Sequence, residues 1–396
     1  MSPEVFFDVC FAAAALLVAV YVGWQLMNLG DWRRRPPDAK DRKDAVPARS
    51  VAVVVPFRNE AANLPALWAS LAAQDYAGPL EYVFVDDHST DGGALLLPPP
   101  ATVLRLADYP PARTTLAHKK AALTYAIGST TADLIVTTDA DCVWPTDGVR
   151  RLVAQTDSAD VVLGPVLVAA RPGFCAAFQG LDLAAYQFLT AATARRGRPV
   201  LANGACFAFR RAAFVGVGGY AGVDHLPSGD DVLLLHKFLA RTQVQGKVEK
   251  EQGQARPGVS YSPTHHAVLT RPVAGWRALW RQRLRWAGKA GSYTEPGLVF
   301  AQGLTFAVCA ALVTALVTYP LHLRPRPLLL LWGTKALVDG LCLAVVLRYY
   351  GQTRLLRWYP LAAVVYPFFL VGVGTAALLG LRSPWKDRPG RPAGKQ

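Results

Sequence analysis

Four apolar stretches divide this chain of 396 residues and limit what it can fold into. The first covers residues 5–27, and three more, at about 298–319, 328–347 and 361–381, end the chain. A helix needs about 20 apolar residues to cross the hydrocarbon core of a bilayer, and each stretch is close to that length. The sequence therefore predicts membrane helices on both sides of a water-soluble part.

Charges next to these stretches predict their orientation. Arg33, Arg34 and Arg35 directly follow the first stretch, and such an excess of basic residues marks the cytoplasmic end of a span. No basic region precedes this stretch and no small-residue cleavage site follows it, so we expect an uncleaved helix instead of a signal peptide. Three C-terminal spans would put the basic tail outside, against the charge rule. The last stretch, which contains Pro367, is therefore a candidate for a re-entrant or interfacial segment.

Composition agrees with a protein that is associated with a membrane. Hydrophobic residues make up 52% of the chain and charged residues 18%, and the net charge is +14. Many cations lie beside apolar stretches, which favours a membrane surface over nucleic acid as the partner. The six cysteines are scattered without a C-x-x-C pair, so neither a disulfide framework nor a zinc site is indicated. Within the second C-terminal stretch, Lys335 and Asp339 are four residues apart and can pair on one helix face.

The most informative segment of the soluble part is 134–141, with the sequence Leu-Ile-Val-Thr-Thr-Asp-Ala-Asp. A short apolar run of this kind predicts a buried strand. Its end would bring Asp139 and Asp141 to the carboxyl edge of a sheet, where open α/β sheets bind ligands. Two close carboxylates repel each other unless a cation lies between them, and Mg²⁺ is often held by one or two carboxylates together with phosphate oxygens. Two solvated aspartates in a turn are the alternative.

Several other segments predict an α/β fold with a mostly parallel sheet flanked by helices. Residues 51–55 and 80–85 are apolar strands on either side of a helix that begins near Asn63, which is a βαβ pattern. The first strand is followed by no glycine-rich loop, so neither a dinucleotide-binding fingerprint nor a P-loop is present. Further strands are expected at 103–106, 161–166 and 203–210, and further helices at 121–127 and 148–155.

Other polar residues lie where this fold would bind a ligand. Lys119 stands at the start of a predicted helix, where its charge opposes the helix dipole, so we expect an anionic partner; a solvated surface lysine is the alternative. Asp230 and Asp231 begin an apolar helix. Capping explains one of these two carboxylates well and the second less well, and an aspartate at the edge of a cleft can act as a general base.

The segment 275–288 predicts an amphipathic helix. At helical spacing its tryptophans and arginines fall on neighbouring stripes, made by Trp276, Trp280 and Leu284 and by Arg277, Arg281 and Arg285. Such a helix suits a membrane interface, with tryptophans at the boundary and arginines towards phosphates. An ordinary amphipathic helix on the surface of a domain is the alternative.

Five sequence pieces occur in order: Pro-Phe-Arg-Asn-Glu at 56–60, Asp-Asp-His-Ser-Thr-Asp at 86–91, Asp-Ala-Asp at 139–141, Gly-Asp-Asp at 229–231 and Gln-Arg-Leu-Arg-Trp at 282–286. Together they resemble the membrane-bound family 2 glycosyltransferases, which have the GT-A nucleotide-sugar fold, a Rossmann-like α/β fold. The resemblance covers residues 50–288, and the flanking apolar stretches fit it as well.

The resemblance implies a role for each matched position in binding the donor. The residues that would hold or shape the nucleotide-sugar site are Pro56, Glu60, Asp86, Asp87, Asp91, Lys119 and Asp139. Asp139 and Asp141 would be the D-x-D pair, which touches the ribose and coordinates Mg²⁺ or Mn²⁺ on the diphosphate.

It also implies the residues of the transfer step. Asp231, with Asp230 beside it, would deprotonate the acceptor hydroxyl in a single displacement that inverts the anomeric carbon. The residues that would match the Q-x-x-R-W motif at the diphosphate and acceptor are Gln282, Arg283, Arg285 and Trp286. Two departures are His118 before Lys119, where glycine is usual, and Gly-Asp-Asp in place of the Thr-Glu-Asp of processive polysaccharide synthases.

The expected protein is a multi-pass enzyme of the cell's inner membrane with a cytoplasmic catalytic domain. It would move a sugar from a nucleoside-diphosphate sugar, with UDP the expected nucleotide, to a lipid-linked or polysaccharide acceptor. A metal-dependent nucleotidyltransferase and a non-catalytic membrane scaffold or transport component are the alternatives. The expected parts are 1–30 (membrane helix), 31–49 (basic linker), 50–270 (catalytic domain), 271–290 (interfacial helix), 297–382 (about three membrane helices) and 383–396 (basic tail).

Overall fold

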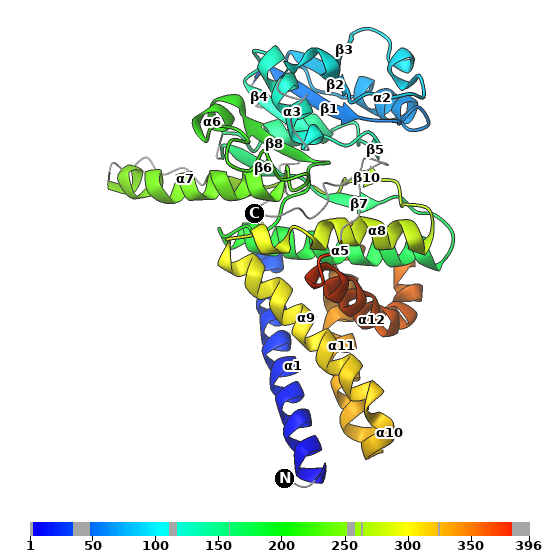
Figure 1. Ribbon diagram of the computed structural model, residues 1–396. Helices are drawn as coiled ribbons and strands as arrows, with labels where there is room; N and C mark the ends of the chain where they lie inside the picture. The colour runs from blue at the N-terminus through cyan, green and yellow to red at the C-terminus, as the bar shows by residue number, and fades with distance from the viewer. Residues whose placement is uncertain are drawn as a thin grey trace. The chain divides into compact units, whose positions relative to one another are not determined.

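The computed structural model describes residues 3–34, 48–110, 117–157, 159–251, 258–262, 264–323 and 325–381 (Figure 1). The chain divides into two compact units. The sheet unit comprises Arg34–Ala169 and Thr193–Pro272, and the helical unit comprises Met1–Arg33, Ala170–Ala192 and Val273–Gln396. Most of the expected basic linker and the expected basic tail lie outside the described residues. The part boundaries expected from the sequence remain predictions.

The sheet unit is built on a seven-stranded sheet with the order β3-β2-β1-β4-β8-β6-β9. β1 is parallel to β2 and β4, β2 to β3, and β6 to β9, whereas β8 is antiparallel to β4 and β6. The predicted mostly parallel sheet flanked by helices is therefore confirmed. The strands are β1 (Val51–Phe57), β2 (Leu80–Asp86), β3 (Ala101–Arg105), β4 (Leu134–Thr137), β6 (Val161–Leu163), β8 (Phe207–Arg210) and β9 (Val259–Tyr261).

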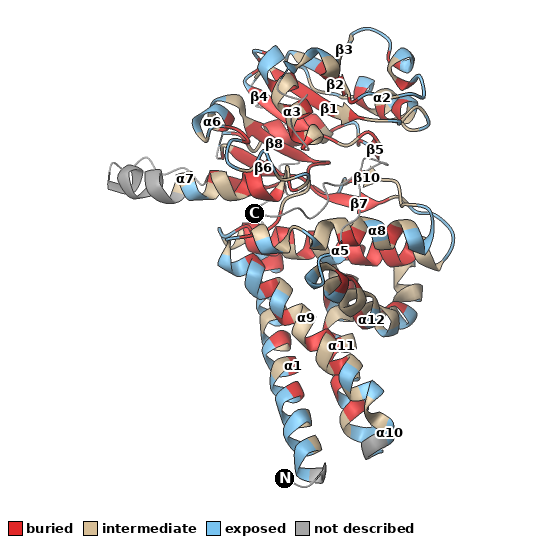
Figure 2. Cartoon of the chain, viewed as in Figure 1, coloured by how far each residue is buried: buried red, intermediate tan, exposed pale blue. Residues whose placement is uncertain are grey.

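β1 lies inside this sheet, and nearly all of its residues are buried, as Figure 2 shows in red. Its first residue, Val51, is opposite Leu80 of β2 on one side and Leu134 of β4 on the other. A strand covered on both faces has a continuous apolar sequence instead of an alternating one, which explains the run Val-Ala-Val-Val-Val. The same register carries the three strands to one common carboxyl edge.

Among its described residues, the sheet unit has five α-helices: α2 (Leu64–Ala72), α3 (His118–Ser129), α4 (Gly148–Val153), α6 (Arg211–Gly216) and α7 (Val232–Glu251). α2 begins after Asn63 as predicted, but the Asn63 side chain does not cap the helix. Its amide group instead donates to Glu60 Oε2, and its Oδ1 accepts from Arg271 Nη1 at 2.6 Å. This asparagine therefore joins two segments that lie far apart in the sequence.

The strand expected at 161–166 is wrong as a single element. It consists of β6 and a separate strand, β7 (Val166–Val168), which belongs to a second sheet with the order β5-β10-β7. Pro165 lies between the two strands, and it has no backbone N–H with which to continue a strand ladder. The other members of the small sheet are β5 (Cys142–Val143) and β10 (Val268–Thr270).

The helical unit contains four described helices that are long and apolar enough to cross a membrane. Large apolar side chains on them are exposed, for example Leu16 at 67% and Leu330 at 70%, which is the surface expected of a helix that faces lipid. The four are α1 (Pro3–Arg33), α9 (Pro296–Val317), α11 (Pro325–Tyr349) and α12 (Tyr359–Leu378). Also present are α5 (Phe174–Arg195), α8 (Gly275–Ala287), α10 (Tyr319–His322) and the 3₁₀ helix η6 (Thr353–Trp358).

A polar cluster joins α1 to α11 inside this unit. Lys335 Nζ lies 2.5 Å from Asp339 Oδ2, which confirms the pairing predicted from their spacing. The Tyr21 hydroxyl donates to Asp339 Oδ1 at 2.7 Å, and the Gln25 amide lies 3.3 Å from the same oxygen. A lone charge among membrane helices is costly. Pairing neutralises Asp339, and the two donors from α1 then fix how α1 packs against α11.

Candidate active site

The loops that follow β1 and β2 meet at the carboxyl edge of the larger sheet. Phe57 at the end of β1 is opposite Asp86 at the end of β2, and Asp87 N–H donates to Phe57 O at 2.8 Å. Thr138 N–H, just after β4, donates to Val54 O at 3.1 Å. The parallel register thus brings the candidate residues that follow three strands to one edge of the sheet.

Two of the predicted nucleotide-site aspartates hold the shape of their loop. Asp86 Oδ1 accepts from the backbone N–H of Ser89 at 2.8 Å. Asp91 accepts from the N–H of Ala61 at 2.7 Å and from that of Gly93 at 3.0 Å, so it fastens the loop after β2 to the segment after β1. These bonds satisfy backbone donors that the tight turn would otherwise leave unpaired.

Three other predicted nucleotide-site residues lie at the end of β1 or in the same loops. Pro56 lies in β1 opposite Val85. Asp87 is buried, and its Oδ1 lies 3.0 Å from His88 Nδ1. Glu60 closes the turn before α2, because its backbone oxygen accepts from the N–H groups of Asn63 and Leu64 at 2.8 and 3.0 Å. The ends of β1 and β2 and the loops that follow them therefore hold five of the predicted residues.

The carboxylates of Asp139, Asp141 and Glu60 act on one another electrostatically. Burial, together with the negative charges of Asp139 and Glu60, raises the pKa of Asp141 to about 6. The site therefore concentrates negative charge, which a bound cation would relieve. Among the described residues, no group of three or more histidine, cysteine or acidic side chains is arranged to hold a metal ion. Two carboxylates suffice where phosphate oxygens complete the coordination.

Lys119 links two of the predicted motifs. Its Nζ lies 2.7 Å from Asp139 Oδ1 and 2.9 Å from Asp230 Oδ2. Burial opposes the charge of this lysine, but the two carboxylates outweigh that effect, so the pKa of Lys119 is raised well above its usual value. The expectation that Lys119 has an anionic partner is confirmed, and it has two.

Asp231 is held by backbone groups. Its Oδ2 accepts from the N–H of Gly204 at 3.2 Å and its Oδ1 from the N–H of Val232 at 2.7 Å. Gly204 packs closely, because a Cβ there would lie 3.0 Å from Asp230 Oδ2 and 3.5 Å from Lys119 Nζ. The turn at Gly204, the start of α3, the end of β4 and the start of α7 therefore converge on one group of charged side chains.

The remaining predicted site residues, Gln282, Arg283, Arg285 and Trp286, lie on α8 in the helical unit. Arg283 is buried, and its Nη2 lies 2.6 Å from Asp182 Oδ2 on α5. Neither α5 nor Asp182 was predicted from the sequence. The only local signal is a single acidic residue within the apolar run 180–186.

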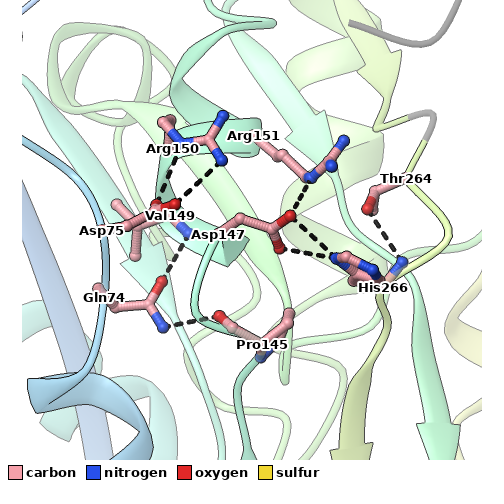
Figure 3. Close-up of polar contacts among 9 residues, drawn as sticks. All are labelled: Gln74, Asp75, Pro145, Asp147, Val149, Arg150, Arg151, Thr264 and His266. Carbon is pink, nitrogen blue, oxygen red and sulfur yellow. Dashed lines mark hydrogen bonds and ion pairs between the residues drawn. The ribbon is translucent and has the colours of Figure 1, made fainter. Parts of the chain in front are cut away.

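A second polar group supports the chain beyond Asp141 (Figure 3). Asp147 Oδ2 lies 2.6 Å from Arg151 Nε and 2.9 Å from His266 Nδ1. Gln74 donates to Pro145 O at 2.7 Å and accepts from Val149 N–H at 2.9 Å. The segment that leaves the D-A-D sequence is thus tied to the turn after α2 and to the segment that precedes β10.

A family model for glycosyl transferase family 2 matches residues 52–216. Among curated proteins, the undecaprenyl-phosphate 4-deoxy-4-formamido-L-arabinose transferase of Salmonella choleraesuis (strain SC-B67) is 32% identical over 133 residues, 31% of this chain and 38% of the relative. An N-acetylglucosaminyltransferase of Bradyrhizobium elkanii is 38% identical over 117 residues, 28% of this chain and 62% of the relative. The matches therefore span less than two thirds of either relative.

One solved structure is similar along most of the chain. It is a mannosyltransferase from Pyrobaculum calidifontis in complex with GDP-Man and Mn²⁺. The TM-score is 0.51 at 24% sequence identity, and the likeness covers 91% of this chain and 99% of the other. This likeness establishes a GT-A-like fold for the chain, and the fold predicted from the sequence is confirmed.

The Asp147 cluster predicts a pH-dependent stability. Burial disfavours the charge of Asp147, but the bonds from Arg151 and His266 outweigh it, so the pKa of Asp147 is lowered from the ordinary 3.8. A lowered aspartate pKa stabilises the fold above the ordinary value, and this contribution is lost as the pH falls through the lowered value. Asp147→Asn should destabilise the protein by about 1–3 kcal/mol at pH 7.

The measurement is thermal unfolding between pH 7 and pH 2.5. The difference in melting temperature between the wild type and the variant should become smaller at the acid end, because the wild type loses the ionised Asp147 there. The matched control is Asp157→Asn, whose partner Arg49 lies 2.9 Å away at a more exposed site. A difference in melting temperature that stays constant over this pH range would contradict the stabilising role of the ionised Asp147.

Proposed function

We propose that this chain, whose residues 52–216 belong to glycosyltransferase family 2, transfers a sugar from a nucleoside-diphosphate sugar to a lipid-linked or polysaccharide acceptor. The observation that carries the proposal is the convergence of Asp139, Asp230 and Asp231 around Lys119 and Gly204 at the carboxyl edge of the sheet. The pair Asp139 and Asp141 suits the binding of a metal and a diphosphate, and the pair Asp230 and Asp231 suits the activation of an acceptor hydroxyl. The name of the Salmonella relative, which contains undecaprenyl-phosphate, supports a lipid-linked acceptor.

The residues present fit a divalent metal, Mg²⁺ or Mn²⁺. Asp139 and Asp141 are hard oxygen donors separated by one small residue, and the raised pKa of Asp141 marks negative charge that a cation would stabilise. When bound, such a metal would offset the charge that develops on the leaving diphosphate. Mn²⁺ in the complex of the solved mannosyltransferase supports this assignment. Lys119, close to Asp139, adds a fixed positive charge on the same side.

Asp231 is the proposed general base. Each of its oxygens accepts one backbone N–H bond, from Gly204 or Val232. A carboxylate oxygen can accept more than one hydrogen bond, so Asp231 retains the capacity to take the proton of an acceptor hydroxyl. The two bonds fix its orientation. A single base acting in a single displacement gives inversion at the anomeric carbon, and general-base catalysis typically contributes about 10²–10⁴-fold.

We further propose that α1, α9 and α11 span the membrane with the α5–α8 end of the helical unit in the cytoplasm. At that end Trp32 of α1 packs against Tyr349 of α11 and Phe188 of α5, with ring centroids 5.8 and 5.9 Å apart. Six exposed arginines of the unit lie at that end, against one described arginine, Arg326, near α10, and the positive-inside rule assigns the end with more basic residues to the cytoplasm. The six are Arg33, Arg277, Arg281, Arg348, Arg354 and Arg357.

In this proposal α12 enters the membrane and returns to the same side. Phe369, in the middle of α12, lies 5.8 Å from Trp280 of α8 and 5.3 Å from Phe178 of α5, measured between ring centroids. Gly372 also abuts Trp280. Within the helical unit, Figure 1 draws α12 beside α8. If α12 spanned the bilayer, it would contact the interfacial helix α8 at one of its ends and not at its middle. A re-entrant α12, with Pro367 inside it, would leave the basic tail in the cytoplasm.

The donor site is tested by calorimetric titration of the detergent-purified protein with UDP, GDP and other nucleoside diphosphates, with and without Mn²⁺. One nucleotide should bind tightly and only with the metal. Asp139→Ala should weaken that binding at least about tenfold, which is about 1.4 kcal/mol. Asp157→Ala, at an exposed ion pair, is the matched control. Unchanged Mn²⁺-dependent affinity in Asp139→Ala would remove the metal assignment, and no binding by the wild type would favour a non-catalytic role.

The base is tested with Asp231→Asn. Because an amide cannot take the acceptor proton, kcat should fall about 10²–10⁴-fold. The donor Kd should change by less than about threefold, because Asp231 is not assigned to donor binding. Radiolabelled sugar transfer gives the rate and calorimetry gives the Kd. If donor binding disappears together with transfer, Asp231 is a binding residue and not the base.

The orientation is tested by cysteine labelling in a background without the six native cysteines. Leu323→Cys, exposed beside α10, should react with a membrane-impermeant maleimide in right-side-out cells. Ala393→Cys, in the basic tail, should react only in inside-out vesicles. If Ala393→Cys is instead labelled from the outside, as Leu323→Cys is, then α12 spans the membrane.

A further inference from the structure

α5 presents a row of polar and aromatic side chains to α8. Gln179, Asp182 and Tyr186 are spaced at i, i+3 and i+7, which places them on one face of a helix. Gln179 Oε1 accepts from the N–H of Val273, just before α8, at 2.9 Å, and its Nε2 donates to Val273 O at 3.1 Å. One face of α5 therefore follows α8 from its beginning towards its end.

The centre of this contact is a buried ion pair between Asp182 and Arg283. Both residues are 8% exposed, and Arg283 Nε and Nη2 lie 2.7 and 2.6 Å from Asp182 Oδ2. Taking two charges out of water is costly, and apolar residues of similar size often give equal or greater stability at such a position. Stability alone is therefore a weak reason for this pair.

Arg283 also touches two residues of the Q-x-x-R-W motif. Its Nη1 donates to Gln282 Oε1 at 2.7 Å, which fixes the carbonyl end of that amide and turns the amide NH₂ group away from Arg283. Its guanidinium lies over the Trp286 ring, 4.1 Å from the centroid. The guanidinium group of Arg283 thus contacts Asp182 along one edge, Gln282 along another edge and the Trp286 ring with its flat face.

Tyr186 completes the arrangement from α5. Its ring meets the Trp286 ring edge-on, with centroids 6.0 Å apart. Burial, together with the charge of Asp182, raises the pKa of Tyr186 to about 12, although the charge of Arg283 opposes this rise. Tyr186 is therefore a neutral hydroxyl at neutral pH. Trp286 is held between a cation over its face and an aromatic ring, so it has little freedom to rotate.

We propose that Asp182 and Arg283 are positioning residues for the transfer step: their buried ion pair orients Gln282 and Trp286, and Arg283 itself does not bind the donor or the acceptor. The proposal rests on the proposed function, because the resemblance gives Gln282 and Trp286 their role at the diphosphate and acceptor. It changes the role predicted for Arg283 from contact with the ligand to support of its neighbours. It also gives a role to Asp182, which no sequence motif marks.

The decisive variant replaces the pair by apolar residues, Asp182→Leu with Arg283→Met. Asp182→Asn alone should lower the melting temperature, because it leaves the guanidinium buried without an anionic partner. The apolar pair should recover the melting temperature. Its kcat should stay about 10–100-fold below that of the wild type, because small misplacements of oriented groups cost rates of this order. The donor KM and the calorimetric Kd of the nucleotide should stay within about threefold of the wild-type values.

The matched control is the same exchange at an ion pair of the sheet unit, Asp75→Leu with Arg150→Met, where Nη2 and Oδ2 are 3.0 Å apart (Figure 3). It should leave kcat unchanged. Arg283→Lys keeps the positive charge but loses the planar guanidinium group. Its melting temperature should equal or exceed that of Asp182→Asn, and its kcat should stay low. Recovery of both kcat and melting temperature by the apolar pair would overturn the proposal, and so would a selective rise in KM.

A fluorine label separates this proposal from the proposed function. The protein is produced with 5-fluorotryptophan, and the Trp286 resonance among the ten tryptophans is assigned with Trp286→Phe. In the wild type it should be a single sharp line, which shifts or broadens in Asp182→Asn and in the apolar pair. If the wild type transfers no sugar but this resonance responds, the function is overturned and the positioning stands. An unchanged resonance overturns the positioning.

Discussion

The parallel pairing of β1 with β2 and β4 is the constraint on which the candidate site depends. Because Val51 is opposite both Leu80 and Leu134, the three strands reach the same edge within a few residues of one another. Parallel strands that are buried on both faces consist of apolar residues. The polar side chains that bind ligands therefore lie in the loops at the carboxyl ends of the strands. A shift of one residue would turn every side chain of β4 to the opposite face of the sheet.

Concentrating carboxylates at one edge carries an electrostatic cost, which the fold meets with a fixed cation and with backbone donors. Lys119 lies between Asp139 and Asp230, and the N–H groups of Gly204 and Val232 hold Asp231. Gly204 matters here because a side chain would occupy the space beside Asp230. In the helical unit the same physical problem has another solution, since Asp182 and Arg283 neutralise each other in a buried pair.

Much of the architecture could be predicted from local pattern. The apolar runs of β1, β2 and β4 and the four long apolar helices are visible in the sequence because their composition alone sets their environment. The two strands within 161–168 were predicted as one, since an apolar run does not reveal that its ends join different sheets. α5 was missed, and with it Asp182, because a single aspartate in an apolar helix has no distinctive spacing; its partner is 101 residues away.

The sequence by itself determined which segments are apolar enough for a sheet core or a membrane, and which short motifs carry carboxylates, a lysine or a glutamine–arginine–tryptophan group. Those properties depend on residue type and near-neighbour spacing. Only the tertiary structure decided the partners: Lys119 with both Asp139 and Asp230, Asn63 with Arg271, and Arg283 with Asp182. Such pairs form between chain segments that only packing brings together, and the charge or hydrogen bond that selects each partner acts over a few ångströms of space and not along the sequence.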